Sequence, residues 1–249
     1  MRSSDSPLVD CLAPSPNFGE RRAPIDSIIL HYTGMETGEG ALAWLRNPAS
    51  EVSCHYFIDE DGRLTQLVAE AARAWHAGAS HWRGHNDLNS RSIGIEIVNQ
   101  GAPAQFPPYP AAQVATVIRL CQDIIQRYAL PAENILAHSD IAPLRKQDPG
   151  EAFPWGELHA HGVGLWVPAA PIVEGEVLEE GHSGTAVKAM QQALQRYGYA
   201  LEATGHFDHL TRAVVAAFQR HFRQARVDGR ADVSTVATLQ TLCAALDAR

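Results

Sequence analysis

One stretch of the sequence, HSDIAPLRKQDPG at residues 138–150, does most to limit how this chain can fold. It contains two prolines and ends in Pro-Gly. Because proline fixes φ and has no backbone N–H, the stretch cannot be a regular helix or a central strand. The apolar run at residues 134–137 before it predicts a short strand, so we expect a shaped loop held at the end of a strand. Taken alone, such a charged loop would more often be a solvated turn.

A second histidine occupies a matching position far upstream. Residues 28–30, Ile-Ile-Leu, predict a buried strand with His31 at its C-terminal end. With His138 and Asp148, this histidine forms a candidate metal site, because a catalytic zinc takes three such protein ligands and leaves a fourth position for water. The chain has 12 histidines, which allow accidental pairings. The residues alone therefore leave buried, hydrogen-bonded core histidines as an equal alternative.

The segment SIGIEIVN at residues 92–99 predicts a buried strand that contains one charge. The strand period of two places its isoleucines on one face, and Glu96 on the other between Gly94 and Val98. A carboxylate inside an apolar strand is unfavourable unless it is paired or functional, and burial would raise its pKa towards that of a general base. A glutamate held by a salt bridge is the alternative, and the candidate metal site favours catalysis.

Hydrophobic periodicity predicts the surrounding fold. Residues 111–128 carry an apolar stripe at three- and four-residue spacing, which predicts a helix packed on a sheet. A short amphipathic helix is expected at residues 38–47, and strands at 52–58 and 63–68 joined by an acidic hairpin turn. This order of elements predicts an α/β domain with a mixed β-sheet flanked by helices.

The composition changes after Trp166. We expect a catalytic domain at residues 1–166, a linker at 167–178 and a second domain at 179–249. In the second domain, residues 185–197 have an apolar face and stop at Gly198, while Asp208 and Asp232 can cap two further helices. The prediction is a small all-α domain of three helices.

Composition also excludes several classes of function. The formal net charge of −8 argues against nucleic acid as a partner. No apolar run approaches the roughly 20 residues that a membrane-spanning helix needs. The four cysteines lack CxxC spacing, so we expect reduced thiols rather than disulfides or a thiolate metal site. Residues 1–22 lack the apolar core of a signal peptide, which favours a cytoplasmic protein, with the periplasm or cell envelope as the alternative.

The segments LHYTG, SCHYFIDEDG, RAWHAG, SIGIEIVNQG and HSDIAPLRKQDPG resemble, in this order, the zinc-dependent N-acetylmuramoyl-L-alanine amidases. This is the type 2 amidase family, which shares its fold with peptidoglycan recognition proteins. The resemblance implies one Zn²⁺ per chain, bound by His31, His138 and Asp148, with Glu96 as the catalytic base and Lys146 as the group that stabilises the oxyanion. No ligand position is substituted, which favours an enzyme over a non-catalytic muropeptide receptor. A different zinc peptidase would more naturally show HExxH, which is absent from the sequence.

The resemblance also implies a substrate. The bond cut would join N-acetylmuramic acid, or its anhydro form, to L-alanine of the peptidoglycan stem peptide. Trp75, His76 and Ala77 would line the substrate groove, although an ordinary loop anchored by a core tryptophan is the alternative. We expect His55 to be a buried, hydrogen-bonded side chain and Arg145 to be structural. The pool of substrate, soluble anhydro-muropeptides or polymeric wall, stays open.

The C-terminal turns GxxG, GxFDxxT and VDGxAD resemble those of the three-helix peptidoglycan-binding module. One departure is that Ala231 and Asp232 stand where the module usually has a glycine after the VDG turn. A plain helical bundle with a stabilising role is the alternative. We expect a further set of aromatic side chains to lie at the surface: His81, Trp82, His85, His182, His206, His209 and His221.

Overall fold

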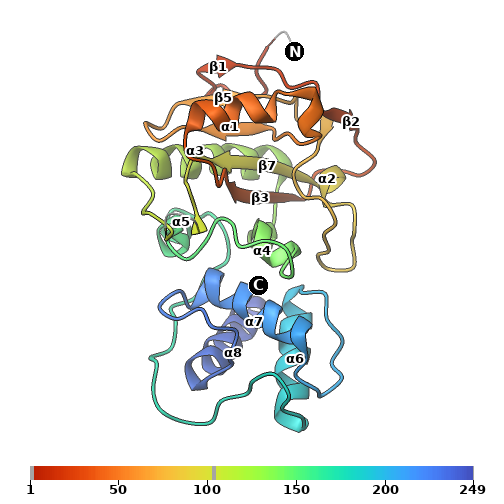
Figure 1. The fold of residues 1–249 in the computed structure, drawn as a ribbon, viewed down its shortest axis with the longest axis vertical. Coiled ribbons are helices and arrows are strands. Elements are labelled where there is room, and N and C mark those ends of the chain that lie inside the picture. Colours follow the sequence, from red (N-terminus) through yellow and green to blue (C-terminus); the bar gives the residue numbers. More distant parts are fainter. Residues whose placement is uncertain (1–2, 103–104, 249) are drawn as a thin grey trace.

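The computed structural model describes residues 3–102 and 105–248. It places a β-sheet with helices on both faces above a smaller group of helices (Figure 1). This arrangement confirms the predicted fold class, an α/β domain with a mixed sheet followed by a small all-α domain. None of the described helices is long and apolar enough to cross a membrane.

The centre of the first domain is a six-stranded sheet in the order β1-β5-β4-β7-β3-β8. Its strands are β1 (Cys11–Leu12), β3 (Ser27–Tyr32), β4 (Tyr56–Ile58), β5 (Leu64–Gln66), β7 (Ser92–Ile97) and β8 (Ile135–Ala137). Neighbouring strands are parallel except β4 and β5, which form the predicted hairpin. A separate antiparallel pair, β2 (Phe18–Glu20) with β6 (Ala72–Ala74), had no signal in the sequence analysis.

The register of the sheet explains where chemistry can occur. Strand β3 lies between β7 and β8, with His31 opposite Glu96 and Leu30 opposite Ala137. His138 follows Ala137 directly. The carboxyl ends of three parallel strands therefore bring two histidines and the strand glutamate to one edge of the sheet.

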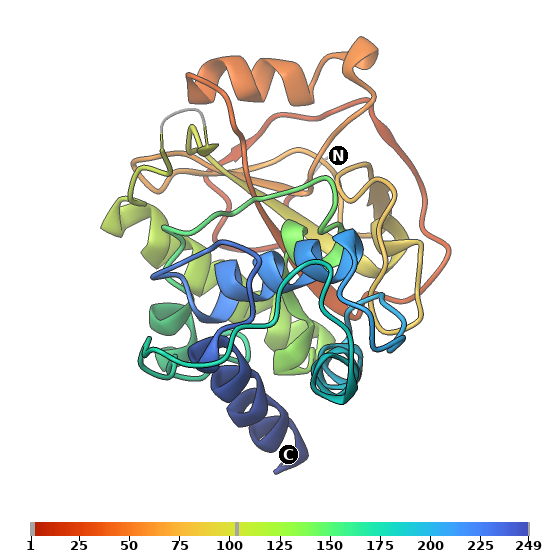
Figure 2. The ribbon, with the colours of Figure 1, turned by 60° about the horizontal axis from the view of Figure 1, so that its bottom comes forward.

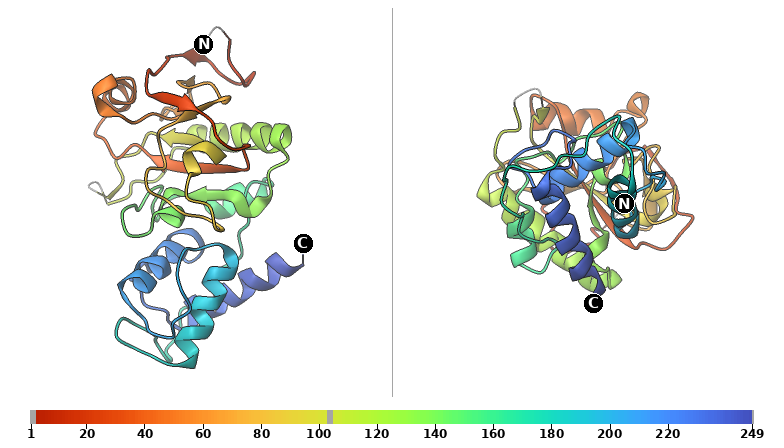
Figure 3. Two further views of the ribbon diagram at one scale, coloured as in Figure 1. Left: turned by 90° about the vertical axis from the view of Figure 1, so that its right-hand side faces the viewer. Right: turned by 90° about the horizontal axis from the view of Figure 1, so that it is seen from below.

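Each face of the sheet is covered by a helix that the periodicity predicted. Helix α3 (Ala111–Tyr128) packs its apolar stripe on one face, against the isoleucines of β7. Helix α1 (Gly38–Leu45) packs on the other face, where Ala41 and Leu45 meet Phe57 and Val98. The left view of Figure 3 shows these two helices on opposite sides of the sheet. Glu96 projects to the α1 side, because its isoleucine neighbours face α3.

Several short helices complete the domain: α2 (Leu88–Arg91), α4 (His138–Ile141), α5 (Trp155–Ala160) and the 3₁₀ turns η1 (Pro48–Ser50) and η3 (Ala132–Asn134). The prediction that residues 138–150 contain no helix is wrong for their first turn, which is α4. Both prolines come after this turn, and the Asp140 carboxylate accepts the backbone N–H of Ala137 at 2.8 Å, which stabilises it. The remainder of the stretch is a loop, as predicted.

The second domain consists of α6 (Thr185–Tyr197), α7 (His209–Phe222) and α8 (Val233–Asp247). The expected caps are present, since the carboxylates of Asp208 and Asp232 each accept the N–H of the threonine three residues later, at 2.8 Å. Gly198 ends α6 with a φ of 151°, which favours glycine. The domain boundaries at residues 166 and 179 stay a prediction.

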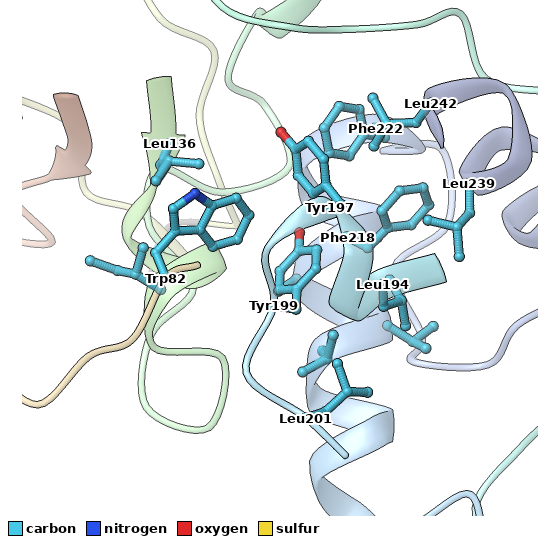
Figure 4. Close-up of a cluster of buried hydrophobic side chains, with 14 of the residues drawn as sticks. Trp82, Leu136, Leu194, Tyr197, Tyr199, Leu201, Phe218, Phe222, Leu239 and Leu242 are labelled. Carbon is cyan, nitrogen blue, oxygen red and sulfur yellow. The ribbon is translucent and has the colours of Figure 1, made fainter. Parts of the chain in front are cut away.

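The two domains share one apolar core. Trp82 of the first domain packs edge-on against Tyr197 and Tyr199 of the second, with ring centroids 5.2 and 5.3 Å apart (Figure 4). Helix α7 lies over α4, as Figure 2 shows with the C-terminal domain in front. The prediction that Trp82 and His221 are surface residues is therefore wrong. They are 3% and 0% exposed, because each is covered by the other domain.

Candidate metal centre

Three side chains meet at the carboxyl ends of β3 and β8. His31 comes from β3, His138 is the first residue of α4, and Asp148 follows in the loop. The Nδ1 atoms of the two histidines are 2.9 Å apart, and Oδ2 of Asp148 lies 3.0 Å from the first and 2.9 Å from the second. All three residues are buried, and the structure brings them together as the sequence predicted.

The hydrogen bonds of His138 determine which of its nitrogens carries a proton. Its Nε2 lies 3.1 Å from the carbonyl oxygen of Ala77. A carbonyl can only accept, so Nε2 of a neutral His138 ring must be the N–H donor. Its Nδ1 is then an unprotonated lone pair that points at His31 and Asp148.

A chain of hydrogen bonds likewise determines which nitrogen of His31 carries a proton. The Ser92 hydroxyl donates to the carbonyl oxygen of Leu88 at 2.5 Å, so towards His76 it acts as an acceptor for Nε2–H, 3.2 Å away. His76 Nδ1 is then unprotonated and accepts from His31 Nε2 at 3.0 Å. His31 Nδ1 is therefore also a bare lone pair. Gly94 makes this possible, because a Cβ there would lie 2.4 Å from the His76 ring.

The triad therefore has two lone pairs and a carboxylate facing one another with no proton between them. Burial and the neighbouring His138 lower the pKa of His31 to about 4. Such a set repels itself unless a cation lies at its centre. Two neutral imidazoles and one carboxylate fit a divalent transition metal, so the residues form a metal-binding triad.

Glu96 and Lys146 lie beside the triad in one cavity of about 480 Å³. The Oε2 atom of Glu96 is buried and has no hydrogen-bond partner among the described residues. Burial and the nearby Asp148 raise the pKa of the Glu96 carboxyl well above its usual range, while Lys146 acts in the opposite direction. No partner in the described chain accounts for Glu96 as a salt-bridged strand residue, which was the alternative in the sequence.

The three expected groove residues occupy different places. Trp75 is half-buried and lines the cavity. His76 also lines it, but its ring nitrogens are both used in the chain from His31 to Ser92. Ala77 is fully buried and contributes its carbonyl oxygen, which accepts from His138 and, at 3.0 Å, from Arg145. Arg145 is thereby structural, as predicted.

Trp44 is among the residues of the cavity wall that sequence reasoning did not assign to the site. It lies on α1, is 49% exposed and forms part of the cavity wall. An aromatic residue on the outer side of an amphipathic helix was the available signal. His55 is buried and hydrogen-bonded, as predicted: its Nδ1 accepts from the Gly94 N–H, and its Nε2 lies 2.9 Å from Arg21.

Comparison with known protein families gives a matching family for each domain. Residues 21–151 match the family described as N-acetylmuramoyl-L-alanine amidase, and residues 183–239 match the peptidoglycan-binding domain family. The N-acetylmuramoyl-L-alanine amidase AmiD of Escherichia coli is 37% identical over 230 residues, which cover 88% of this chain and 82% of AmiD.

Two solved structures extend the comparison to nearly the whole chain. The first is E. coli AmiD in complex with the substrate anhydro-N-acetylmuramic acid-L-Ala-D-γ-Glu-L-Lys, with 36% identity and a TM-score of 0.75 over 94% of this chain and 91% of that one. The second is AmpDH3 of Pseudomonas aeruginosa in complex with anhydromuramic pentapeptide. It has 32% identity and a TM-score of 0.72 over 99% of each chain.

Proposed function

Because this chain belongs to the N-acetylmuramoyl-L-alanine amidase family, we propose that it is a zinc hydrolase of (anhydro-)muropeptides. It cleaves the amide between N-acetylmuramic acid, or its anhydro form, and L-alanine of the stem peptide. The observation that carries this proposal is the buried triad of His31, His138 and Asp148 beside the unpaired Glu96 carboxylate. Two relatives that match this chain over both domains were solved with anhydromuramyl peptides bound, which supports the substrate class.

We propose zinc as the metal, held by His31, His138 and Asp148. Two imidazole nitrogens and one carboxylate oxygen are a ligand set typical of catalytic zinc, which keeps a further position open. When bound, zinc supplies Lewis acidity, which favours deprotonation of water near neutral pH and polarises a carbonyl group. The protein fixes both imidazoles through His76 and the Ala77 carbonyl, and such outer partners keep the correct nitrogen free for the metal.

Glu96 and Lys146 are the proposed catalytic side chains. Glu96 takes the proton of the attacking water and returns it to the nitrogen of the leaving L-alanine, so the amide becomes a carboxyl group and a free amine. The raised pKa of the Glu96 carboxyl makes it a stronger base than an ordinary glutamate. The Lys146 ammonium stabilises the oxyanion that develops on the carbonyl, and such a donor is worth about 3 kcal/mol.

We propose that the cavity wall binds the substrate next to the triad. Trp44, Trp75 and the loop at residues 145–147 all line the cavity. Aromatic walls suit the apolar face of a sugar ring. His76 and Ala77 act on substrate only through the metal histidines, so within this proposal their substrate-binding role is indirect.

The test is digestion of two substrates, soluble anhydro-muropeptide and intact sacculi, by the purified full-length protein. We expect release of stem peptide that a chelator abolishes and added zinc restores. Release from the soluble substrate alone supports an enzyme of muropeptide recycling, and comparable release from sacculi supports a cell-wall hydrolase. If zinc-loaded protein released no peptide from either substrate, the amidase proposal would fail in favour of a non-catalytic receptor. The cellular compartment stays a prediction.

A further inference from the structure

A buried carboxylate joins the metal centre to the C-terminal domain. Asp140 lies in α4, two residues after the metal ligand His138, and is 1% exposed. Its Oδ1 accepts the Tyr199 hydroxyl at 2.7 Å, and its Oδ2 lies 2.7 Å from His221 Nδ1. The same Oδ2 accepts the Ala137 backbone N–H at 2.8 Å. One carboxylate thus connects the start of α4 to two side chains of the other domain.

The two partners of Asp140 are held rigidly. The His221 ring is stacked between Trp155, at a centroid distance of 3.7 Å, and Phe222, at 4.1 Å. Its Nδ1 must carry the proton, because a carboxylate only accepts, and its buried Nε2 has no hydrogen-bond partner among the described residues, as suits a neutral ring. The Tyr199 ring packs edge-on against Trp82, as Figure 4 shows. Neither donor can leave without breaking aromatic packing between the domains.

Helix α4 in turn positions two of the three metal ligands. His138 is its first residue, and the carbonyl of His138 accepts the N–H of Ala142 at 3.0 Å, which closes the turn. The N–H of Ser139 donates to the carbonyl oxygen of Asp148 at 3.0 Å. A shift or rotation of α4 therefore moves the donor atoms of both His138 and Asp148.

Loss of the donors from the C-terminal domain would not leave α4 unchanged. A buried carboxylate without enough hydrogen bonds is strongly unfavourable, so Asp140 would move towards water or draw water in. Either response displaces the helical turn that carries His138. Metal ligands must be held within a few tenths of an ångström to bind well, and residues outside the ligand set contribute much of that precision.

We propose that Tyr199 and His221 are positioning residues of the metal centre, and that the C-terminal domain acts on catalysis through Asp140. This role is separate from any binding of glycan by that domain. It rests on the proposed metal site but not on the identity of the substrate.

The experiment uses the full chain with Tyr199→Phe, and with Tyr199→Phe combined with His221→Phe. Tyr199→Phe removes only the hydroxyl, and His221→Phe keeps an aromatic ring in the stack while it removes the N–H donor to Asp140. Zinc affinity is measured by competition with a chromophoric chelator, and ligand geometry from the absorption spectrum of the cobalt-loaded protein. We expect zinc affinity to fall about 10-fold in the single variant and up to about 100-fold in the double variant. The cobalt spectrum should change, and kcat should fall while KM stays the same.

The matched control is Gln224→Ala, which removes another hydrogen bond between the domains, to the Phe153 carbonyl oxygen at 2.7 Å, without touching Asp140. It should lower Tm with no change in zinc affinity or spectrum. Adding Asp140→Asn to the double variant removes the buried charge and should restore part of the zinc affinity.

Two outcomes would overturn the positioning role. One is wild-type zinc affinity and cobalt spectrum in the double variant, and the other is a loss of affinity in Gln224→Ala as large as in Tyr199→Phe. Failure of the proposed function looks different. If the wild-type protein binds zinc but does not cleave muropeptide, the amidase proposal fails. The zinc affinities of the wild type and the variants can still be compared, so the positioning role is tested independently.

Discussion

Two buried carboxylates in the first domain, Glu70 and Asp148, differ in whether hydrogen-bond donors of the chain face them. Glu70, 2% exposed, accepts hydrogen bonds on both oxygens from Tyr56, Tyr128 and Arg127, at 2.5 to 2.7 Å. Asp148 instead faces two imidazole nitrogens whose protons are used elsewhere. The first cluster is complete within the chain, whereas the second is complete only with a cation. Counting the hydrogen-bond donors around a buried carboxylate therefore separates a structural cluster from a functional one, which burial alone cannot do.

The largest effect is expected from Asp148→Ala, which tests whether the second cluster binds a metal. It removes the anionic ligand of the triad, so zinc binding should be lost and kcat/KM should fall by roughly 1,000-fold or more, since the metal supplies several kcal/mol of transition-state stabilisation. Metal content and turnover of anhydro-muropeptide are the measurements. Retention of stoichiometric zinc by the variant would contradict the assignment of Asp148 as a ligand.

Glu96→Gln tests the unpaired carboxylate beside the triad. The amide has nearly the same shape but cannot accept the proton of water, so kcat should fall by about 100- to 10,000-fold. Zinc content should be unchanged, and thermal stability should not decrease, because Glu96 Oε2 has no partner in the described chain to lose. Activity within 10-fold of wild type would show that another group is the base.

Glu70→Gln should give the opposite result. It disrupts a satisfied buried ion pair, so the free energy of unfolding should fall by about 2–3 kcal/mol, at the low end for such a pair because the Arg127 side chain is 30% exposed and can turn to water. The activity of the folded enzyme should not change. Urea unfolding and kcat measure the two effects.

The matched control for Glu70→Gln is Asp123→Asn, which loses a more exposed pair with the same Arg127. It should change the free energy of unfolding by at most about 1 kcal/mol. Equal effects of the two substitutions would mean that burial of Glu70 adds nothing.

The last prediction is a pH slope from His55, which contacts Arg21 and the His76 ring. Burial and the neighbouring Arg21 lower the pKa of His55 to about 3, against about 6.5 in an unfolded chain. The unfolded chain then binds more protons between these values, so stability falls as the pH falls from about 6.5 towards 3, by at most about 1.4 kcal/mol per pH unit. In metal-free protein, His55→Gln should reduce the fall in the free energy of unfolding between pH 6.5 and pH 3, measured by urea unfolding. Equal pH dependence of the free energy of unfolding in the two proteins would rule out the contribution of His55.

Much of the fold was predictable because its signals are local. The bounds of α3 and α6 agree with the expected ranges 111–128 and 185–197, since helical periodicity and end residues belong to the segment itself. The caps at Asp208 and Asp232 are equally local. The pair β2 and β6 and the single turn of α4 were missed, because two or three residues of strand or one turn of helix carry too little pattern.

The sequence by itself pointed to the metal triad: strand ends made His31 and His138 candidates, and the resemblance of five ordered motifs to the zinc amidases selected them together with Asp148. The same resemblance predicted Glu96 as the base beside them. Only the tertiary structure decided which nitrogens of the histidines are free, and that Trp82, Asp140 and His221 are buried together between the domains. Burial of such side chains is a property of two surfaces in contact. The partners of Asp140 lie 59 and 81 residues further along the chain, and neither segment alone differs from one that faces water.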